Sequence, residues 1–409
     1  MKRHLILFTA NHPFAHRGGE TMFVAPELTH LAGAFESVTL VPLYDRGLAL
    51  PLPAGVAVDR RLAQGWARGV AVHAVAALAW PGVFAELWRA ARHGGVPGFA
   101  RVWRWAAIAR ASRVWLARHG RRGDDVLLYT YWRGGQSLAA ARAADEGVVG
   151  AAVTRVHGHD IYEDAFRPPF QPWPGVYGRL ALTITVSQHA CNHLLDRGVA
   201  PQRLLVSRLG VVAAPALAQA SSDGQWRIMS CAAITDSKRV DLTARVLGAL
   251  ARRHPQQAIV WTHFGDGASR AGVDDEVLRL PANVRAELRG QVPNADVLAH
   301  YGSRPVDLFV HLSAQEGLPV SIQEALAHGV PVIACDVHGV AEAFDAESRD
   351  GALLPVDVPL EDAVAALEGV LLATPPVRAA QRARAWRHWQ RAFDAQRNHA
   401  RLAHALAAL

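Results

Sequence analysis

The stretch from residue 306 to residue 334 restricts the fold of this chain more than any other. Residues 306–312 form a short run rich in β-forming residues, and residues 313–317 contain turn formers. Pro319 suits the first helical position, where its missing N–H is not needed, and Gly329 suits the end of that helix. An apolar run at residues 331–334 then predicts a second strand. The stretch is therefore a predicted βαβ unit, in which a right-handed helical crossover joins two parallel strands.

Two glutamates lie eight residues apart in this unit, Glu316 before the helix and Glu324 inside it. At about 1.5 Å per helical residue this step spans roughly 12 Å, about the distance from the ribose to the sugar of a nucleotide diphospho-sugar. The free N–H groups of the first helical turn lie between them and attract an anion such as a diphosphate. Carboxylates accept hydrogen bonds from paired hydroxyls, so Glu324 is a candidate for the ribose and Glu316 for the hexose. A capped amphipathic helix with two solvated glutamates has the same spacing, so spacing alone leaves both interpretations open.

The rest of the chain repeats the alternation of strand and helix. Its 409 residues are too many for one core and suit two α/β domains. Predicted strands of the first alternation lie at residues 5–9, 37–41, 125–129, 151–156 and 182–186, and a second alternation runs from 227 to about 354. We expect an N-terminal Rossmann-like domain at 1–212, a linker at 213–225, a C-terminal Rossmann-like domain at 226–376, and a C-terminal helix at 377–409 that crosses back to the first domain.

The compartment is indicated by cysteine usage and by the N-terminus. Cys191, Cys231 and Cys335 are too few and too scattered for a disulfide framework or a zinc site, which points to a reducing environment. The apolar run at residues 5–8 is too short for the core of a signal peptide. We therefore expect a cytoplasmic protein, soluble or peripheral on the inner face of the cytoplasmic membrane.

Several motifs of the second half resemble one enzyme family. The Glu316-x7-Glu324 pattern, with Pro-Val-Ile-Ala after it, is similar to the signature of retaining glycosyltransferases of family 4, also called group 1. Lys238 stands at the position of that family's diphosphate-binding lysine. Gly265 lies in a run that resembles its glycine turn, and Gly339 in one that resembles its final glycine loop. The resemblance implies a GT-B type fold, with two Rossmann-like doubly wound domains facing across a cleft.

Motifs of the first half, at residues 17–23, 129–132 and 155–163, resemble a subgroup found in bacterial surface-polysaccharide synthesis. By this resemblance His157 reaches the donor sugar from the first domain, and Asp160 supports its loop. Gly18 and Gly19 would let the backbone approach the acceptor or the donor phosphate at the carboxyl end of the sheet, although an ordinary tight turn remains the alternative.

His157 and His159 also suggest a metal cluster at first sight. On an extended segment, however, the two side chains would point to opposite faces, so they make a poor chelating pair.

The activity implied by the resemblance is transfer of a sugar, a hexose above all, from a nucleotide diphospho-sugar to a saccharide or lipid-linked saccharide of exopolysaccharide, capsule or lipopolysaccharide. Glu316, with the Gly317 and Leu318 backbone, would hold the sugar hydroxyls, Glu324 the ribose and Lys238 the diphosphate. The family's usual proposal is a front-face mechanism in which the departing phosphate acts as base. Donors aimed at that phosphate would then contribute most to the rate.

Three departures from the family pattern bear on this site. Ala233 occupies the place of an arginine that often accompanies the lysine, and His338 replaces the first glycine of the final loop, where it would narrow the sugar pocket or add a contact. No two aspartates are separated by one residue, so the Asp-x-Asp metal clamp of the other major glycosyltransferase fold is missing. We therefore expect no metal and no cofactor, only the nucleotide sugar as co-substrate.

Residues 60–122 are the most skewed in charge, with twelve arginines against one acid, Glu86, and with six of the twelve tryptophans. Arginine and tryptophan beside apolar helical stretches suit the headgroup layer of an anionic membrane. Nucleic acid attracts the same residues, but no nucleic-acid fold signature accompanies them. The third interpretation is an arginine-rich surface with tryptophan in the core.

Two other functions remain open. One is a nucleotide-sugar epimerase or phosphorylase on the same fold, because a fold does not fix the chemistry. The other is a non-catalytic scaffold of a polysaccharide assembly complex. Retention of Glu316, Glu324 and Lys238 argues against the scaffold.

Overall fold

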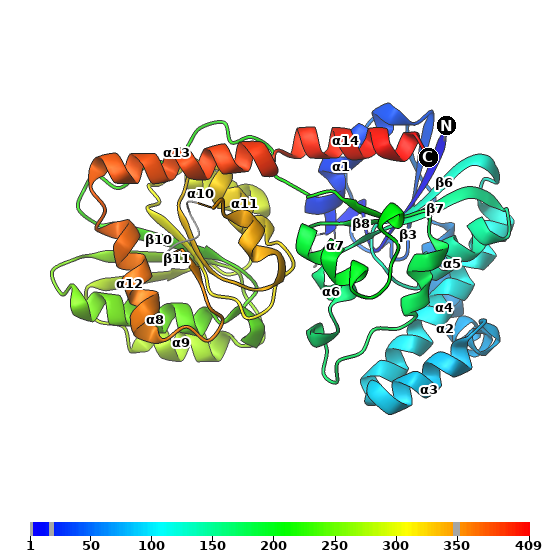
Figure 1. The fold of residues 1–409 in the computed structure, drawn as a ribbon, viewed down its shortest axis with the longest axis horizontal. Helices are drawn as coiled ribbons and strands as arrows, with labels where there is room; N and C mark the ends of the chain where they lie inside the picture. Colours follow the sequence, from blue (N-terminus) through cyan, green and yellow to red (C-terminus); the bar gives the residue numbers. More distant parts are fainter. Residues whose placement is uncertain (1–2, 16–19, 347–351) are drawn as a thin grey trace. The chain divides into compact units, whose positions relative to one another are not determined.

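The computed structural model describes residues 3–15, 20–346 and 352–409 (Figure 1). The chain forms two compact units. The first comprises Met1–Leu209 with Gln396–Leu409, and the second comprises Gly210–Ala395.

The described part of the first unit is built on a parallel sheet of seven strands in the order β5-β3-β1-β6-β7-β8-β9. Its strands are β1 His4–Thr9, β3 Ser37–Pro42, β5 Val56–Val58, β6 Gly123–Thr130, β7 Val149–Val156, β8 Leu182–Thr185 and β9 Leu204–Val206, and β2 Phe14–Ala15 pairs separately with β4 Leu48–Ala49. Its helices are α1 Glu20–Ala34, α2 Arg61–Ala76, α3 Val83–His93, α4 Gly95–His119, α5 Gly135–Asp145, α6 Gly158–Ile161, α7 Gln188–Leu195 and α14 Ala395–Ala407.

Both faces of this sheet are covered, which is why its strands are almost continuously apolar. Leu5 and Leu7 of β1 face α1 and Leu402 of α14, whereas Ile6 and Phe8 face the side of α4, α5 and α7.

A fully buried ion pair joins α1 to β7 on the face of the sheet that α1 covers. The Arg155 guanidinium donates from Nη2 to Glu27 Oε2 at 2.6 Å, and both side chains are 0% exposed. The Tyr129 hydroxyl donates to Glu27 Oε1 at 2.7 Å and accepts from Arg155 Nε at 2.9 Å. Arg155 Nη1 also donates to Ser207 O at 2.9 Å, so the polar groups of these three side chains are hydrogen-bonded within the protein.

The second unit has a parallel sheet of six strands, counted over its described residues, in the order β12-β11-β10-β13-β14-β15. These strands are β10 Trp226–Cys231, β11 Ile259–Phe264, β12 Val284–Leu288, β13 Leu308–His311, β14 Val332–Cys335 and β15 Leu353–Leu354. The helices are α8 Val240–Arg253, α9 Arg270–Leu278, α10 Asn294–Ser303, α11 Val320–Ala327, α12 Leu360–Leu371 and α13 Pro375–Ala392. Helices α8, α9 and α12 lie on one face of the sheet and α10 and α11 on the other (Figure 1).

In each sheet the strand order reverses beside the first strand, between β1 and β6 and between β10 and β13. Open α/β sheets bind ligands at this position, outside the carboxyl ends of the strands. The five strands predicted in the first half are all present, but the short edge strands β5 and β9 were not predicted.

Two expected segments differ from the structure. Residues 213–225, expected as a linker, are bound to the second unit, because the Asp307 carboxylate accepts hydrogen bonds from Ser221 N at 2.8 Å and Ser221 Oγ at 2.6 Å. The tail is two helices rather than one. Helix α13 packs on α11 of the second unit, and α14 belongs to the first.

The chain passes between the units twice, and the two segments in which it does so are hydrogen-bonded to each other. Val211 N donates to Phe393 O at 2.9 Å, and Ala395 N donates to Val211 O at 3.2 Å. The residues that precede α14 are thus fixed to those that open the second unit.

Among the described helices, no single one is both long and apolar enough to cross a membrane. Two bent helix pairs, Arg61–Ala79 with Val83–His93 and Leu360–Leu371 with Pro375–Ala392, meet the requirement by length and composition alone.

Candidate functional site

The loops after β10 and β13 meet at the carboxyl edge of the second sheet. The loop after β10 leads into the short 3₁₀ helix η5 Asp236–Lys238, and the loop after β13 leads to Glu316. Ala314 N donates to Ser237 O at 2.7 Å and joins the two loops. Because β10 and β13 are neighbours in the sheet, Lys238 and Glu316 come together there.

Two nitrogen atoms that carry hydrogen lie next to the same oxygen of the Glu316 carboxylate. Lys238 Nζ lies 2.5 Å and His311 Nε2 lies 2.6 Å from Glu316 Oε1, and the glutamate side chain is 9% exposed. Burial by itself would raise the pKa of Glu316, but His311 and Lys238 lower that pKa to about 2. Glu316 is therefore ionised at neutral pH.

His311 was not predicted as a site residue. It is the last residue of β13, and Ser313 Oγ lies 3.0 Å from the same Nε2. Because the Glu316 carboxylate only accepts, Nε2 of His311 must carry the hydrogen in this contact. The sequence signal was a polar ring at the end of an apolar strand, five residues before the predicted carboxylate.

The final glycine loop contacts the backbone around Glu316. It forms the 3₁₀ helix η6 His338–Ala343, and Gly339 N donates to Gly317 O at 3.0 Å. His338 has a φ of +47°, in the left-handed region that favours glycine, and its Nδ1 lies 2.7 Å from Glu316 O. The departure from the family glycine thus adds a contact that holds the backbone of Glu316.

Glu324 is the fifth residue of α11, whereas Glu316 lies four residues before that helix begins. The first-turn N–H groups of α11, which follow the buried Leu318, have no acceptor within the helix. They lie in the chain between the two carboxylates, as the sequence predicts.

The Glu324 side chain is buried, and its burial sets its pKa. It is 3% exposed, and its Oε1 accepts a hydrogen bond from Asn294 Nδ2 at 2.8 Å. Burial raises the pKa of Glu324 to about 7, against the effect of the Asn294 bond. Burial and the Glu324 charge together raise the pKa of Cys231 to about 12. Asn294 was not predicted, because its position at the start of α10 gives no sequence signal.

Gly265 directly follows β11 and lies against the loop after β10. Its φ is +137°, and a Cβ atom at this position would lie 1.8 Å from Ala232 O. The two loops are also joined where Ile234 N donates to Asp266 O at 3.0 Å. Only glycine allows this close approach, which holds the loop that carries Lys238.

Ala233 is exposed and supplies no charge. Arg239, which follows Lys238 in the chain, does not replace the arginine that the family often has in place of Ala233. The Arg239 guanidinium donates to Leu312 O at 2.7 Å and Val356 O at 2.6 Å. It therefore supports the loops behind the site, and Lys238 is the cation that contacts Glu316.

In the first unit, His157 follows β7 and is surrounded by aromatic rings. Its ring centroid lies 4.1 Å from that of Trp132, and its Nδ1 lies 3.4 Å from Asp160 Oδ2. Asp160 Oδ2 also accepts from His157 N at 3.1 Å, so this carboxylate supports the loop. His157 Nε2 is buried and, among the described residues, has no hydrogen-bond partner.

The expectation of an extended segment at residues 157–160 is wrong, because His157 caps the short helix α6. The His159 ring packs on Phe166, with 4.5 Å between the ring centroids, whereas the His157 ring packs on Trp132. Among the described residues, no three His, Cys, Asp or Glu side chains form a group that would hold a metal ion. Gly18 and Gly19 lie outside the described residues.

Glu20 organises the loop after β1, although it was not predicted as a site residue. Its carboxylate accepts from Ala10 N at 2.8 Å, Asn11 N at 2.5 Å and His12 N at 2.7 Å. It also accepts from Trp132 Nε1 at 2.6 Å, which places that ring against His157. Its only sequence signal was its place in the motif at residues 17–23.

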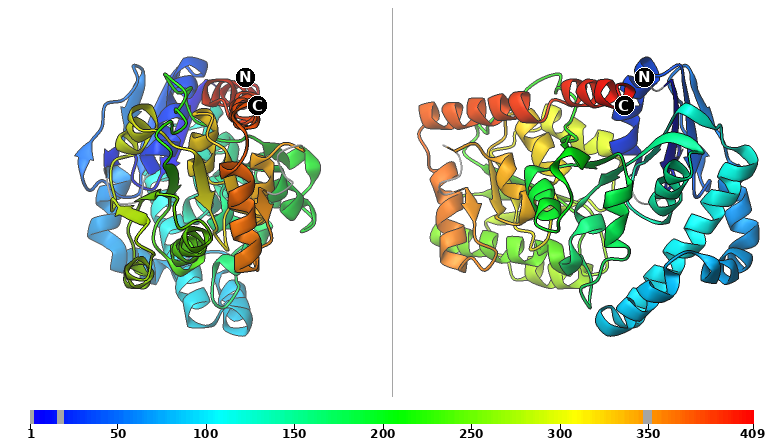
Figure 2. Two further views of the ribbon diagram at one scale, coloured as in Figure 1. Left: turned by 90° about the vertical axis from the view of Figure 1, so that its left-hand side faces the viewer. Right: turned by 45° about the vertical axis from the view of Figure 1, so that its right-hand side comes forward.

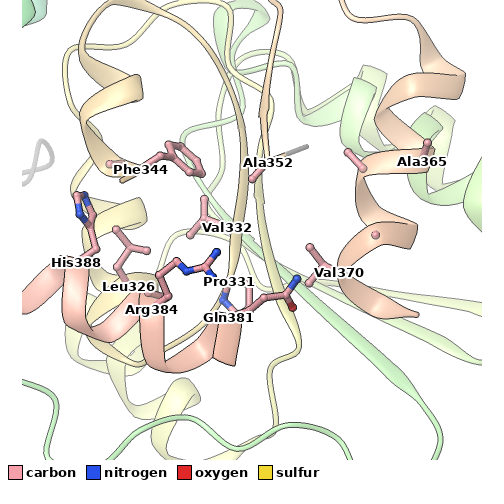
Figure 3. A pocket seen from close by; sticks show the side chains of 14 residues that line it. Leu326, Pro331, Val332, Phe344, Ala352, Ala365, Val370, Gln381, Arg384 and His388 are labelled. Atoms are coloured by element: carbon pink, nitrogen blue, oxygen red, sulfur yellow. The ribbon is translucent and has the colours of Figure 1, made fainter. Parts of the chain in front are cut away.

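A separate pocket of about 230 Å³ lies between β14, α11, α12 and α13 (Figure 3). Leu326, Val332 and Phe344 form its apolar side, with Gln381 and Arg384 among the polar residues that line it. None of the predicted site residues lines this pocket.

Comparison with known proteins identifies the second unit more closely. Residues 218–386 match the family model described as glycosyl transferases group 1. WcaL of Salmonella typhimurium, named as a colanic acid biosynthesis glycosyltransferase, is 24% identical over 239 residues, 54% of this chain and 56% of WcaL. A GDP-mannose-dependent alpha-mannosyltransferase of Mycobacterium tuberculosis is 28% identical over 275 residues, 66% of this chain and 55% of the relative. The matches therefore span little more than half the length of these relatives.

A solved structure matches over the full length. Anabaena HepE, crystallised in complex with UDP and glucose, has a TM-score of 0.65 and 14% identity, with 100% of each chain covered. The predicted fold of two Rossmann-like doubly wound domains is thus confirmed. The chain has the GT-B fold, and its residues 218–386 match the glycosyl transferases group 1 model.

Proposed function

We propose that this protein is a retaining glycosyltransferase that moves a hexose from a nucleotide diphospho-sugar to a saccharide or lipid-linked saccharide of a bacterial surface polysaccharide. The observation that carries the proposal is the carboxylate of Glu316, ionised between Lys238 and His311 at the β10/β13 reversal, with Glu324 eight residues later on α11.

The diphosphate would lie between the two glutamates. Lys238 Nζ and the first-turn N–H groups of α11 supply positive charge and donors there, and donors aimed at the departing phosphate lower the barrier most. We propose that these groups meet the leaving-group charge without a divalent ion. Binding of the phosphate would draw Lys238 Nζ partly from Glu316 to the ligand.

Each carboxylate then has one role. Glu324, buried with one hydrogen bond from Asn294, would accept from the two ribose hydroxyls. Glu316 would accept from hydroxyls of the sugar near the anomeric carbon. Because it is ionised at neutral pH, it cannot serve as a general acid, and in the proposed front-face mechanism the departing phosphate takes the acceptor proton.

His157 is proposed to bind a sugar hydroxyl through Nε2. The support is that this nitrogen is buried and has no partner among the described residues, while Asp160 and Trp132 fix the ring. A hydroxyl can serve either tautomer of the imidazole, because it both donates and accepts.

The donor and the biological role are proposed from the relatives' names. One relative is named for GDP-mannose and a structural neighbour holds UDP and glucose, so both nucleotides are candidates. The name of WcaL supports a surface polysaccharide as product. Such synthesis would place the protein in the cytoplasm.

A thermal-shift titration with UDP, GDP, UDP-glucose and GDP-mannose tests the donor site, because a ligand that binds only the native state raises the melting temperature with its concentration. We expect a shift with one nucleotide in the wild type, a loss of that shift in Glu324→Ala, and no change in Glu361→Gln, an exposed glutamate of α12. Absence of a shift with every nucleotide would contradict the proposal. Conversion of the nucleotide sugar without an acceptor would instead identify an epimerase.

A further inference from the structure

Helices α2, α3 and α4 of the first unit expose an unusual amount of apolar side chain. Half of the large hydrophobic side chains that are exposed in the described residues lie between residues 70 and 99. They are Val70, Val72, Val75, Leu78, Phe84, Trp88, Val96 and Phe99, with exposed fractions from 40% at Leu78 to 84% at Val96. Soluble proteins rarely leave such a group of side chains in water without a partner.

These side chains recur at helical spacing. Val72 and Val75 lie three residues apart on the part of α2 that follows its kink at Gly69, and Trp88 follows Phe84 by four residues on α3. The end of α4 that carries α3 runs out from the rest of the unit (Figure 2). The exposed apolar side chains are thus carried by α2, by residues 77–79 after it, by α3 and by the first residues of α4.

Most tryptophans of residues 60–122 are buried or half-buried. The membrane contact that the sequence suggested for the tryptophans therefore cannot involve all six. Trp66, Trp80 and Trp115 are buried, at 8%, 8% and 4% exposure, and Trp103 and Trp105 are half-buried. Trp88 is the exposed tryptophan of residues 60–122, at 62%. The surface thus depends on aliphatic side chains, phenylalanine and one tryptophan.

The charge around this surface is positive. Residues 60–122 contain twelve arginines and one acid, and that acid, Glu86, is paired with Arg89 at 3.0 Å. Arg68 and Arg92 are exposed beside the apolar side chains, and the Arg92 guanidinium lies 4.6 Å from the Trp88 ring centroid. A partner of this surface must therefore combine apolar and anionic groups.

We propose that this surface docks on an anionic phospholipid bilayer; it is made of Val70, Val72, Val75, Leu78, Phe84, Trp88, Val96 and Phe99. The apolar side chains would enter the boundary of headgroups and acyl chains, and the exposed arginines would bind lipid phosphates. A second copy of the chain is a poorer partner, because its arginines would face these arginines. Single-stranded or duplex nucleic acid would leave the valines and leucine in water.

One segment connects the docking surface to the loop of His157. Gln171 O accepts from Arg89 Nη2 of α3 at 2.6 Å, and Phe170 O accepts from Arg101 Nη1 of α4 at 2.6 Å. The amide of Gln171 in turn donates to His159 O at 3.1 Å. If the proposed function holds, docking would bring this loop close to a lipid-linked acceptor, but docking itself does not rest on that function.

Vesicle flotation of the full chain tests the proposal. With vesicles of phosphatidylcholine and phosphatidylglycerol we expect most of the protein to float at low salt, and with phosphatidylcholine alone we expect it to stay at the bottom. The Phe84→Ser/Trp88→Ser variant should lose flotation by at least tenfold. Leu278→Ser, which changes a side chain of 84% exposure in the second unit, should float like the wild type.

Two further measurements keep the result unambiguous. An unchanged melting temperature of the Phe84→Ser/Trp88→Ser variant without vesicles shows that it is folded, and an Arg68→Gln/Arg92→Gln variant should weaken flotation on anionic vesicles several-fold. The proposal fails if the wild type does not float on anionic vesicles or if the Phe84→Ser/Trp88→Ser variant floats equally well. It also fails if the wild type is a dimer that this variant dissociates, because the surface would then join two copies. Failure of nucleotide binding would leave flotation unaffected, so the two proposals are separable.

Discussion

Lys238 Nζ lies 2.5 Å from Glu316 Oε1, although 78 residues separate the two in the chain. The contact exists because β10 and β13, which each end just before one of these residues, are neighbours at the reversal of the strand order. The sheet topology thus brings the two opposite charges of the proposed donor site together, and each holds the other before any ligand arrives.

Loss of the Glu316 charge should affect the chemical step more than donor binding. We expect Glu316→Gln to lower kcat by about 10²- to 10³-fold, because an ionised group aimed at the reacting sugar would be lost, while the nucleotide still raises the melting temperature. The rate is measured as release of nucleoside diphosphate with acceptor at saturation. Arg245→Gln, on the exposed side of α8, is the control and should keep the wild-type rate. Wild-type turnover in Glu316→Gln would contradict the assigned role.

Nucleotide binding should depend on pH through Glu324. In the free protein burial raises the pKa of Glu324 to about 7, whereas ribose hydroxyls that donate to the carboxylate favour its ionised form. Binding below pH 7 therefore releases a proton, so the association constant should rise with pH up to about 7 and stay constant above it. Calorimetric titration in buffers of different ionisation enthalpy measures the proton. Glu324→Gln should bind the nucleotide sugar, whose diphosphate has no group that titrates between pH 5.5 and 8, more weakly and with an association constant that does not change over that range. A pH dependence like that of the wild type would refute the assignment.

The carboxylate of Glu324 also makes the empty protein sensitive to pH. Because the folded-state pKa is raised above the model-peptide range, the contribution to stability is complete below about pH 4.5 and is lost as pH rises through 7. At about 1.4 kcal/mol per pKa unit, ionisation in the empty site costs roughly 3 kcal/mol. We expect the free energy of unfolding of Glu324→Gln, minus that of the wild type, to be larger at pH 8 than at pH 5. Urea unfolding at the two pH values measures this difference. An equal difference at both pH values would contradict the raised pKa.

Substitution of Gly265 should destabilise the second unit. A Cβ atom would lie 1.8 Å from Ala232 O, and φ is +137°, so Gly265→Ala must move the loop that carries Lys238, at a cost of about 2–4 kcal/mol. Calorimetry of the purified protein measures the change. Gly272→Ala is a matched control, since nothing lies within 4 Å of its added Cβ within α9, and it should stabilise the unit by about 0.5–1 kcal/mol. Similar melting temperatures for the two variants would show that the close approach is not required.

The buried pair of the first unit gives a double-mutant test. Arg155→Met leaves Glu27 buried without its cation and should cost about 3–5 kcal/mol. The double variant Glu27→Leu/Arg155→Met removes both charges and should recover most of that loss. Calorimetric melting of the wild type, Glu27→Leu, Arg155→Met and the double variant measures the coupling energy, and strictly additive effects would show that the two side chains do not stabilise each other.

The sequence predicted the features that depend on residues close to one another in the chain. Strand and helix alternate in the hydrophobic pattern, and Pro319 and Gly329 delimit α11, so both glutamates were assigned to the correct loop and helix. His311 and Asn294 were missed because their contacts with the glutamates depend on which elements become neighbours in space. Four residues of α6 are too few to show a helical period, which is why residues 157–160 were expected to be extended.

The end of the chain was also predicted only in part. Residues 377–409 are helical by composition, but the break before α14 depends on bonds from Phe393 and Ala395 to Val211, far away in sequence. Gly18 and Gly19, named from a motif, lie outside the described residues, so their role stays a prediction.

The placement of α14 has a consequence for the order in which the protein matures on the ribosome. Leu402, Ala403 and Leu406 of α14 pack against Leu5, Leu7 and Leu28 of the first unit. These three side chains are synthesised after all of Gly210–Ala395. Domains generally fold from the N-terminus during translation, but here the sheet face that α1 and α14 share stays partly uncovered until residues beyond Gly210–Ala395 are made. The second unit can complete its own core before the first one does.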